Sequence, residues 1–328
     1  MTGTEGGLGR ALAQRLAQRD DVAGLVEVAG LAELAGAVAA GRLTDVGTLV
    51  HLATTYDVAL PAAERRASNV GGTAHVLEAA RSAGVRRVVL MTSADVWGAL
   101  PDNPVPLADA SPRHAEGDDE TLLGDHVEVE RLAEHAARSG MATTVLRPAT
   151  LVGGALGPAY DGQLLRRLGA PRLLALRGVE PLWQLCHVED LLAALELASA
   201  GLVTGALGVG CEGALEQSRV EQLSGRPRIE LPAAVARASA ERLHRVGVTT
   251  SSARELDHLL APLVVACDGL RTAGWAPAWT NEAALVAHLA TRADDGRSAA
   301  AVTAAGATVA VLGTAALLRR TRRRRRRV

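Results

Sequence analysis

A glycine-rich segment at the beginning of the chain constrains the fold more than any other feature of the sequence. Gly3, Gly6 and Gly9 are spaced as G-x-x-G-x-x-G, and a helical pattern follows directly. This spacing suits a turn that leaves a strand, brings bare backbone close to a pyrophosphate and packs the next helix tightly on a sheet. The first turn of that helix offers free N–H groups to a phosphate. The segment therefore predicts a dinucleotide-binding loop, with an ordinary glycine-rich turn as the alternative.

The residues around this loop fit it in one respect and depart from it in another. A strand-like run over residues 22–28 contains Glu27, close to the place where an acid binds a ribose in such folds. Only two residues precede the first glycine, whereas a buried strand of about five residues is expected there. A sheet without its central strand leaves backbone groups unpaired, so we expect the natural chain to begin upstream.

Short apolar runs alternate with helical patterns over the first 150 residues. This alternation predicts an α/β fold with a Rossmann-like, doubly wound parallel sheet whose first strand is truncated. A helical repeat protein is excluded because no fixed sequence period is present. The expected strands cover residues 22–28, 48–53, 87–92 and 143–147, and the expected helices cover residues 8–19, 31–40, 70–83 and 122–139.

The pattern loosens after about residue 150, which indicates a smaller substrate lobe. Helices are expected there over residues 188–200, 232–246 and 252–260. We divide the chain into a dinucleotide-binding domain (1–150), a substrate lobe (151–291), a linker (292–297), a hydrophobic helix (298–318) and an arginine-rich tail (319–328).

The charges of the chain are unevenly distributed. All 35 basic residues are arginines, and eight of them lie in the last ten residues, which leaves a body of net charge −9. An acidic body of this kind is not expected to bind nucleic acid; only the tail is suited to phosphates. The three cysteines lie far apart in the sequence, so neither a disulfide framework nor a metal site is predicted.

The uncharged segment 298–318 is long enough to span a bilayer, at about 1.5 Å per residue across about 30 Å, but it is only marginally apolar. No signal peptide is visible, and a cofactor-binding body and an arginine run both belong on the cytoplasmic side. We therefore expect a cytoplasmic protein whose tail lies on the anionic inner face of the cell membrane. A helical tail free of the membrane is the alternative.

Short segments in a fixed order along residues 2–290 form a further pattern. Each is weak by itself, but the ordered set resembles the extended short-chain dehydrogenase/reductases, in the NAD-dependent epimerase/dehydratase branch. The segments are TGTEGGLG at residues 2–9, HLA at 51–53, NVGGT at 69–73, MTSADVWG at 91–98, LRP at 146–148, HVED at 187–190 and GWAP at 274–277.

This resemblance implies NAD or NADP as cofactor, a nucleotide sugar or similar hydroxyl or carbonyl compound as substrate, and a homodimer. It implies that Ser93 hydrogen-bonds the substrate oxygen and that His187 and Asp190 shape the substrate lobe. Capping of the following helix is the alternative role for His187, and the one we favour. The implied cofactor-binding residues are Gly3, Gly6, Leu8, Gly9, Glu27, Ala53, Thr54, Asn69 and Pro148.

The sequence departs from the family at the catalytic pair, Tyr-x-x-x-Lys. The chain has no lysine, and neither of its two tyrosines lies in the helix expected over 122–139. Matching Glu134 to the acid that often follows the family lysine by four residues puts His126 at the tyrosine position and Glu130 at the lysine position.

His126 is thus a candidate for proton exchange, with an ordinary pKa of about 6.5 that a carboxylate at Glu130 is expected to raise. A slip of one residue gives Val127 and Arg131, and Arg131 suits a ribose hydroxyl. The alternative is a solvated helix face. We expect an oxidoreductase with weakened or altered catalysis; a non-catalytic dinucleotide-binding sensor or scaffold at the membrane is the alternative.

Overall fold

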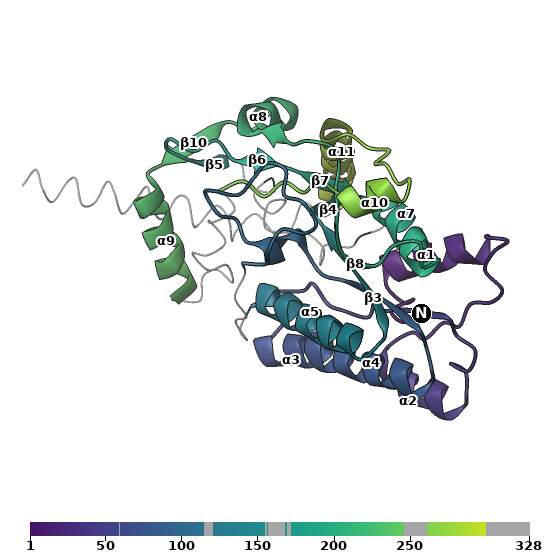
Figure 1. Ribbon diagram of the computed structural model, residues 1–328. Coiled ribbons are helices and arrows are strands. Elements are labelled where there is room, and N and C mark those ends of the chain that lie inside the picture. The colour runs from purple at the N-terminus through teal and green to yellow at the C-terminus, as the bar shows by residue number, and fades with distance from the viewer. Residues whose placement is uncertain are drawn as a thin grey trace, which may run out of the picture.

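The centre of the fold is a four-stranded parallel sheet (Figure 1). The computed structural model describes residues 1–58, 60–114, 121–154, 156, 168, 172–245 and 261–299. The strands follow one another across the sheet in the order β1 (Thr48–Val50), β2 (Arg87–Met91), β3 (Ala142–Pro148) and β8 (Gly205–Val209). The predicted α/β fold with a parallel sheet is confirmed.

The first residues of the chain extend this sheet beyond β1 by single bridges. Thr2 pairs with both His51 and Val28, its N–H donating to the Val50 carbonyl (2.9 Å). The strand predicted over residues 22–28 is wrong apart from Val28, which donates to the Met1 carbonyl (2.9 Å). A strand pairs only as far as its partner extends, and Thr2 forms a single bridge on each side.

Helices cover both faces of the sheet. Along β2, Val89 and Met91 pack in one apolar cluster with α1 (Gly7–Ala17) and α7 (Val188–Ser199). Val88 and Leu90 point the other way and pack with α2 (Leu31–Ala39), α4 (Gly72–Ser82) and α5 (Leu122–Arg138). This alternation follows from the two-residue period of a strand. Figure 1 shows α2, α4 and α5 along one side of the sheet.

The four helices expected in the first half are confirmed, with one difference in extent. The helix expected from Val70 begins earlier, at α3 (Ala62–Arg66), and continues through a π-helical turn, η1 (Ala67–Gly71), into α4. Insertions of this kind are frequent at functional sites, and Asn69 lies within this one.

The second half of the chain contributes both to the main sheet and to a lobe at its end. β8 is the fourth strand of the main sheet, and α7 packs on one face of that sheet. Both elements lie beyond the domain boundary expected at residue 150. Three strand pairs build the lobe: β4 (Thr150–Val152) with β7 (Leu185–His187), β5 (Leu173–Leu176) with β10 (Arg228–Leu231), and β6 (Leu182–Trp183) with β9 (Leu215–Glu216). Its helices are α8 (Gln217–Ser224), α9 (Ala233–Arg245) and α11 (Asn281–Ala299), whereas α10 (Asp268–Thr272) packs on β8 of the main sheet.

The structure describes only part of the C-terminal region, so it tests only some of the predictions made there. Residues 292–297, expected as a linker, belong to α11, consistent with a segment that contains no proline. The helix expected over 252–260 and the residues after Ala299 lie outside the described part of the chain. Among the helices that the structure describes, none combines the length and apolar character needed to cross a membrane.

Candidate functional site

The glycine loop is built so tightly that two of its glycines have no room for a side chain. Gly3 has φ +82°, and a Cβ there would lie 2.5 Å from the Leu52 carbonyl carbon and 2.6 Å from the Ala53 nitrogen. A Cβ on Gly9 would lie 2.1 Å from the Gly3 carbonyl oxygen. Gly6 differs, because its Cβ would meet only that same oxygen, at 3.5 Å. The loop thus packs against the end of β1 and leaves Gly6 exposed and bare of any side chain, with its own N–H donating to the Gly3 carbonyl (3.2 Å).

The N-terminus of α1 completes this loop. Gly6 is the N-cap and provides no side-chain cap. In the described structure the N–H groups of Gly7, Leu8 and Gly9 have no partner, as expected for an uncapped first turn. Leu8 is buried, with its side chain in the core cluster beneath the sheet. The hydroxyl of Thr54, just beyond Ala53, is also buried without a partner. Free amides at a helix N-terminus fit a pyrophosphate, and the residues present therefore fit a dinucleotide.

A chain of buried hydrogen bonds connects this loop to η1. Thr73 Oγ1 donates to the Asn69 carbonyl (2.6 Å) and therefore accepts from His51 Nε2 (3.3 Å). His51 Nδ1 is then the acceptor for Thr2 Oγ1 (2.7 Å). Burial lowers the pKa of His51 to about 4, in keeping with a neutral ring. The ring thereby holds the start of the glycine loop on η1.

Asn69 fastens the loop that follows β1. Its Oδ1 accepts from the Thr55 N–H (2.8 Å), and its Nδ2 donates to the Thr55 carbonyl (2.9 Å). The same Nδ2 lies 3.3 Å from Asp125, which also accepts from Arg65 Nε at 2.8 Å. Asn69 thus joins this loop to α5.

The ends of β2 and β3 carry the other predicted residues. Ser93 is half-buried and caps a short 3-10 helix, η2 (Ala94–Trp97), by accepting from the Asp95 N–H (3.2 Å). Pro148 is buried at the end of β3. Glu27 lies exposed beside Val28, and its carbonyl accepts a hydrogen bond from Arg42 Nη2 (2.7 Å).

A tyrosine that the sequence analysis did not single out lies at the end of β2. The Tyr56 hydroxyl donates to the Thr92 carbonyl (3.0 Å), one residue before Ser93. Its ring lies 5.2 Å, between centroids, from the ring of His126. The only sequence signal was its position three residues after the segment at residues 51–53.

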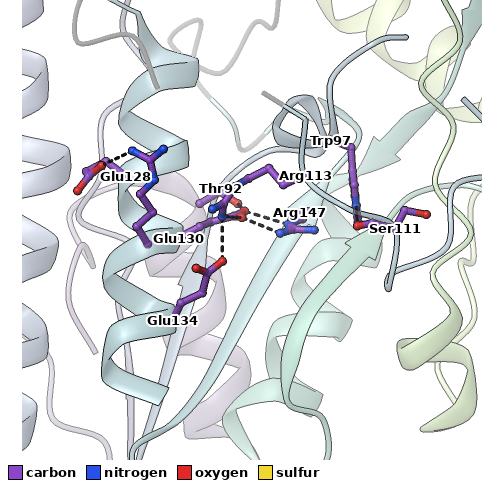
Figure 2. A network of polar contacts seen from close by, with 9 residues as sticks. Thr92, Trp97, Ser111, Arg113, Glu128, Glu130, Glu134 and Arg147 are labelled. Atoms are coloured by element: carbon purple, nitrogen blue, oxygen red, sulfur yellow. Dashed lines mark hydrogen bonds and ion pairs between the residues drawn. The ribbon is translucent and has the colours of Figure 1, made fainter. Parts of the chain in front are cut away.

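Glu130 is the centre of a buried network of charges (Figure 2). Its carboxylate accepts from Arg147 Nε (2.9 Å) and Nη2 (2.6 Å), from Thr92 Oγ1 (2.8 Å) and from Arg113 Nη1 (3.0 Å). The Arg147 guanidinium also lies over the Trp97 ring, 4.5 Å from its centroid. Three of these hydrogen bonds tie α5 to the ends of β2 and β3, and the fourth ties it to the loop that contains Arg113.

The solvated helix face considered for α5 is wrong for His126 and Glu130, which are both buried. It holds for Arg131, which is exposed and pairs with Glu128 (3.1 Å) rather than facing the site. The expected rise in the pKa of His126 is also wrong. Burial lowers this pKa to about 4, because desolvation outweighs the nearby carboxylates of Asp95 and Glu130.

Acidification is therefore expected to destabilise the fold through His126. Its pKa is about 4 when folded and about 6.5 when unfolded, so the unfolded state takes up the proton first and stability falls as the pH drops through this range. The fall amounts to about 3 kcal/mol. Denaturant titrations between pH 7 and pH 4 measure it, and H126Q should flatten the dependence. H135Q, at an exposed position of α5, is the matched control; equal slopes for both variants would contradict a buried neutral ring at position 126.

The substrate-lobe residues have structural partners. His187 caps α7 by accepting from the Glu189 N–H (3.3 Å), which confirms the alternative favoured above, and its ring stacks on Trp279 at 3.7 Å. Asp190 accepts from the N–H groups of Ala278 (2.8 Å) and Trp279 (3.2 Å), and burial raises its pKa. The two residues thus hold the segment before α11 on α7.

Comparison with known proteins gives matches to one family. Residues 1–206 match the model of the NAD dependent epimerase/dehydratase family. An uncharacterised protein of Mycobacterium tuberculosis is 31% identical over 194 residues, which are 57% of this chain and 50% of that protein. A 3-diazoavenalumate denitrifying reductase of a Streptomyces species is 35% identical over 138 residues, 42% of this chain and 45% of that protein. The chain spans about half the length of these curated relatives.

Solved structures share the fold. UDP-glucose 4-epimerase of Thermotoga maritima, crystallised with UDP-glucose, superposes with a TM-score of 0.64 at 16% identity, over 90% of this chain and 98% of that one. WbmG of Bordetella bronchiseptica, crystallised with NAD and UDP, gives 0.64 at 20% identity, over 90% and 93%. At these identities the likeness establishes the architecture alone.

Proposed function

Because this chain belongs to the NAD dependent epimerase/dehydratase family, we propose that it is an oxidoreductase that binds NAD or NADP and acts on a hydroxyl or carbonyl group of a nucleotide sugar or a similar compound. Two proteins of similar fold were crystallised with UDP-glucose and with NAD and UDP, which supports this class of ligands. The bound dinucleotide supplies or takes up the hydride.

The glycine loop carries this proposal. Gly3 and Gly9 are packed so closely that only glycine fits, and they hold the bare Gly6 backbone beside the uncapped first turn of α1. A core helix has no structural need for such a loop, whereas a pyrophosphate needs close approach to backbone N–H groups. The loop therefore favours phosphate binding over an ordinary turn.

The other cofactor-binding residues are proposed along the same sheet edge. Ala53 and Thr54 would line the path from the pyrophosphate toward α5, and Thr54 has a buried hydroxyl to offer. Glu27 would reach a ribose from beside the Val28 bridge, and Pro148 would lie beside the nicotinamide. Ser93 would hold the substrate oxygen, since ligands of such sheets bind at the carboxyl ends of the strands.

The proton-exchanging group is where this chain departs most from its family. Glu130 is buried and Glu134 is exposed, which favours Glu130 as the acid that follows the family lysine by four residues. That alignment moves His126 to the lysine position and Leu122 to the tyrosine position. The Tyr-x-x-x-Lys pair of the family is therefore absent in this alignment too. With a pKa of about 4, the His126 ring holds no exchangeable charge at neutral pH. We therefore propose that catalysis is weakened or altered.

Isothermal titration of the purified chain with NAD+, NADH, NADP+ and NADPH tests the proposal. We expect saturable binding of at least one of the four at a single site. Turnover is then sought with UDP-glucose, by the absorbance of reduced cofactor and by separation of the sugar products. Absence of binding by all four dinucleotides would reject the proposed function.

A non-catalytic dinucleotide sensor is the second candidate. It is favoured by one observation on two buried side chains of α5. The His126 ring is uncharged at neutral pH, and the Glu130 carboxylate is neutralised by its ion pairs with Arg113 and Arg147. Binding without turnover of any nucleotide sugar tested would support it. Contact of the tail with a membrane and formation of a homodimer stay predictions from the sequence.

A further inference from the structure

The loop after β1 brings a phenol to the place where the carboxyl ends of β1 and β2 meet. Tyr56 donates a hydrogen bond to the Thr92 carbonyl (3.0 Å) at the end of β2. Ser93, proposed to hold the substrate oxygen, is the next residue. Asn69 fixes this loop by two hydrogen bonds to the Thr55 backbone, so the position of the phenol is well defined.

One aromatic neighbour of Tyr56 comes from α5. The Tyr56 ring packs on the uncharged His126 ring of α5, at a centroid distance of 5.2 Å and a tilt of 54°. The charged groups that act on His126 are Asp95 from η2, Glu130 from α5 and Arg65 from α3. Glu130 has its own four donors, and Arg65 is held by Asp125. Tyr56 is only half-buried, so a ligand can approach it.

We propose that Tyr56 is the catalytic residue that exchanges a proton with the reacting oxygen, in place of the phenol that α5 lacks. This inference rests on the proposed function. His126 then has a different part: its neutral ring forms the wall against which the phenol packs.

In the direction of reduction, Tyr56 is the proton donor. The substrate carbonyl carbon receives two electrons with the hydride, its carbon–oxygen π bond opens, and the oxygen takes the proton of Tyr56 as the phenol O–H bond breaks. The phenolate regains its proton from solvent through its exposed side. In the direction of oxidation the phenolate would remove the hydroxyl proton, and the hydride would pass from the same carbon to the oxidised dinucleotide, whose reduced form would supply it in the direction of reduction.

The test needs no substrate, because the chain has only two tyrosines. Ultraviolet difference absorbance follows the ionisation of both phenols with pH, and subtraction of the Y56F curve isolates Tyr56. The oxidised nicotinamide ring carries a positive charge. If it lies beside the phenol, saturating NAD+ should lower the pKa of Tyr56 by about 1 to 3. ADP-ribose, which lacks the nicotinamide, should leave this pKa unchanged, and Y160F is the matched control that should keep the full NAD+ effect.

The outcomes separate the two proposals. NAD+ that binds by calorimetry but does not move the Tyr56 ionisation would overturn this inference and leave the proposed function standing. An effect that survives in Y56F would assign the shift to Tyr160 and overturn it as well. Failure of every dinucleotide to bind would instead reject the proposed function itself.

Discussion

Gly6→Ala is expected to weaken dinucleotide binding strongly while the fold stays intact, and Gly9→Ala is expected to damage both. The two glycines belong to the same loop but differ in the space around them. A Cβ on Gly6 would lie 3.5 Å from the Gly3 carbonyl oxygen, an ordinary contact, whereas a Cβ on Gly9 would lie 2.1 Å from it. Gly6 also has φ −73°, which alanine adopts freely.

The expected magnitudes follow from these distances. Overpacking at Gly9 should cost about 1 to 3 kcal/mol or more of unfolding free energy. At Gly6 the added methyl group would project toward the bare face and hold a pyrophosphate away from the amides. Loss of one hydrogen bond to a charged group costs about 1.5 to 3 kcal/mol, which is on the order of a 10- to 100-fold loss of affinity.

Thermal unfolding and calorimetry with the dinucleotide that binds the unaltered chain measure the two effects. Gly24→Ala is the control, since nothing lies within 4 Å of a Cβ at that position. Unaltered affinity in Gly6→Ala would show that the bare backbone does not meet the phosphates. Unaltered stability in Gly9→Ala would contradict the close approach of α1 to Gly3.

The sequence predicted the elements whose signal is local. The alternating apolar runs and the amphipathic helices of the first half were found within a few residues, because each pattern reports the face that an element buries. The run over 22–28 failed because a strand also needs a partner, and the chain offers Val28 only the bridge at Thr2. Similarly, no local pattern indicates that β8, from beyond residue 150, returns to the first sheet.

The candidate site was less predictable because its side chains are placed by distant parts of the chain. His126, Glu130 and Glu134 are spaced by four residues and share one side of a helix, so spacing cannot say which are buried. Glu130 is the buried carboxylate because Arg147 and Thr92, from other parts of the chain, donate hydrogen bonds to it. Tyr56 carried no motif of its own, and only the folded loop brings it beside His126.

Glu130→Ala is expected to destabilise the fold by about 3 to 5 kcal/mol, the cost of leaving one member of a buried ion pair alone. The carboxylate is 2% exposed, and its removal leaves Arg147, itself 6% exposed, without a counter-charge. It also removes the acceptor of Thr92, next to Ser93. Glu134→Ala is the matched control one turn along α5. Its carboxylate contacts the same Arg113 (3.1 Å) but is 53% exposed, so we expect a loss of at most about 1 kcal/mol.

A double variant distinguishes lost charge balance from lost packing. Arg147→Met combined with Glu130→Leu removes both charges and keeps an apolar group over the Trp97 ring, where the present guanidinium lies at 4.5 Å. Exchange of a buried ion pair for apolar residues of similar volume is often neutral. The double variant should therefore recover most of the stability that Glu130→Ala loses, as measured by urea denaturation. If it is no more stable than Glu130→Ala, the carboxylate acts through its hydrogen bonds to Thr92 and Arg113 rather than by balancing Arg147.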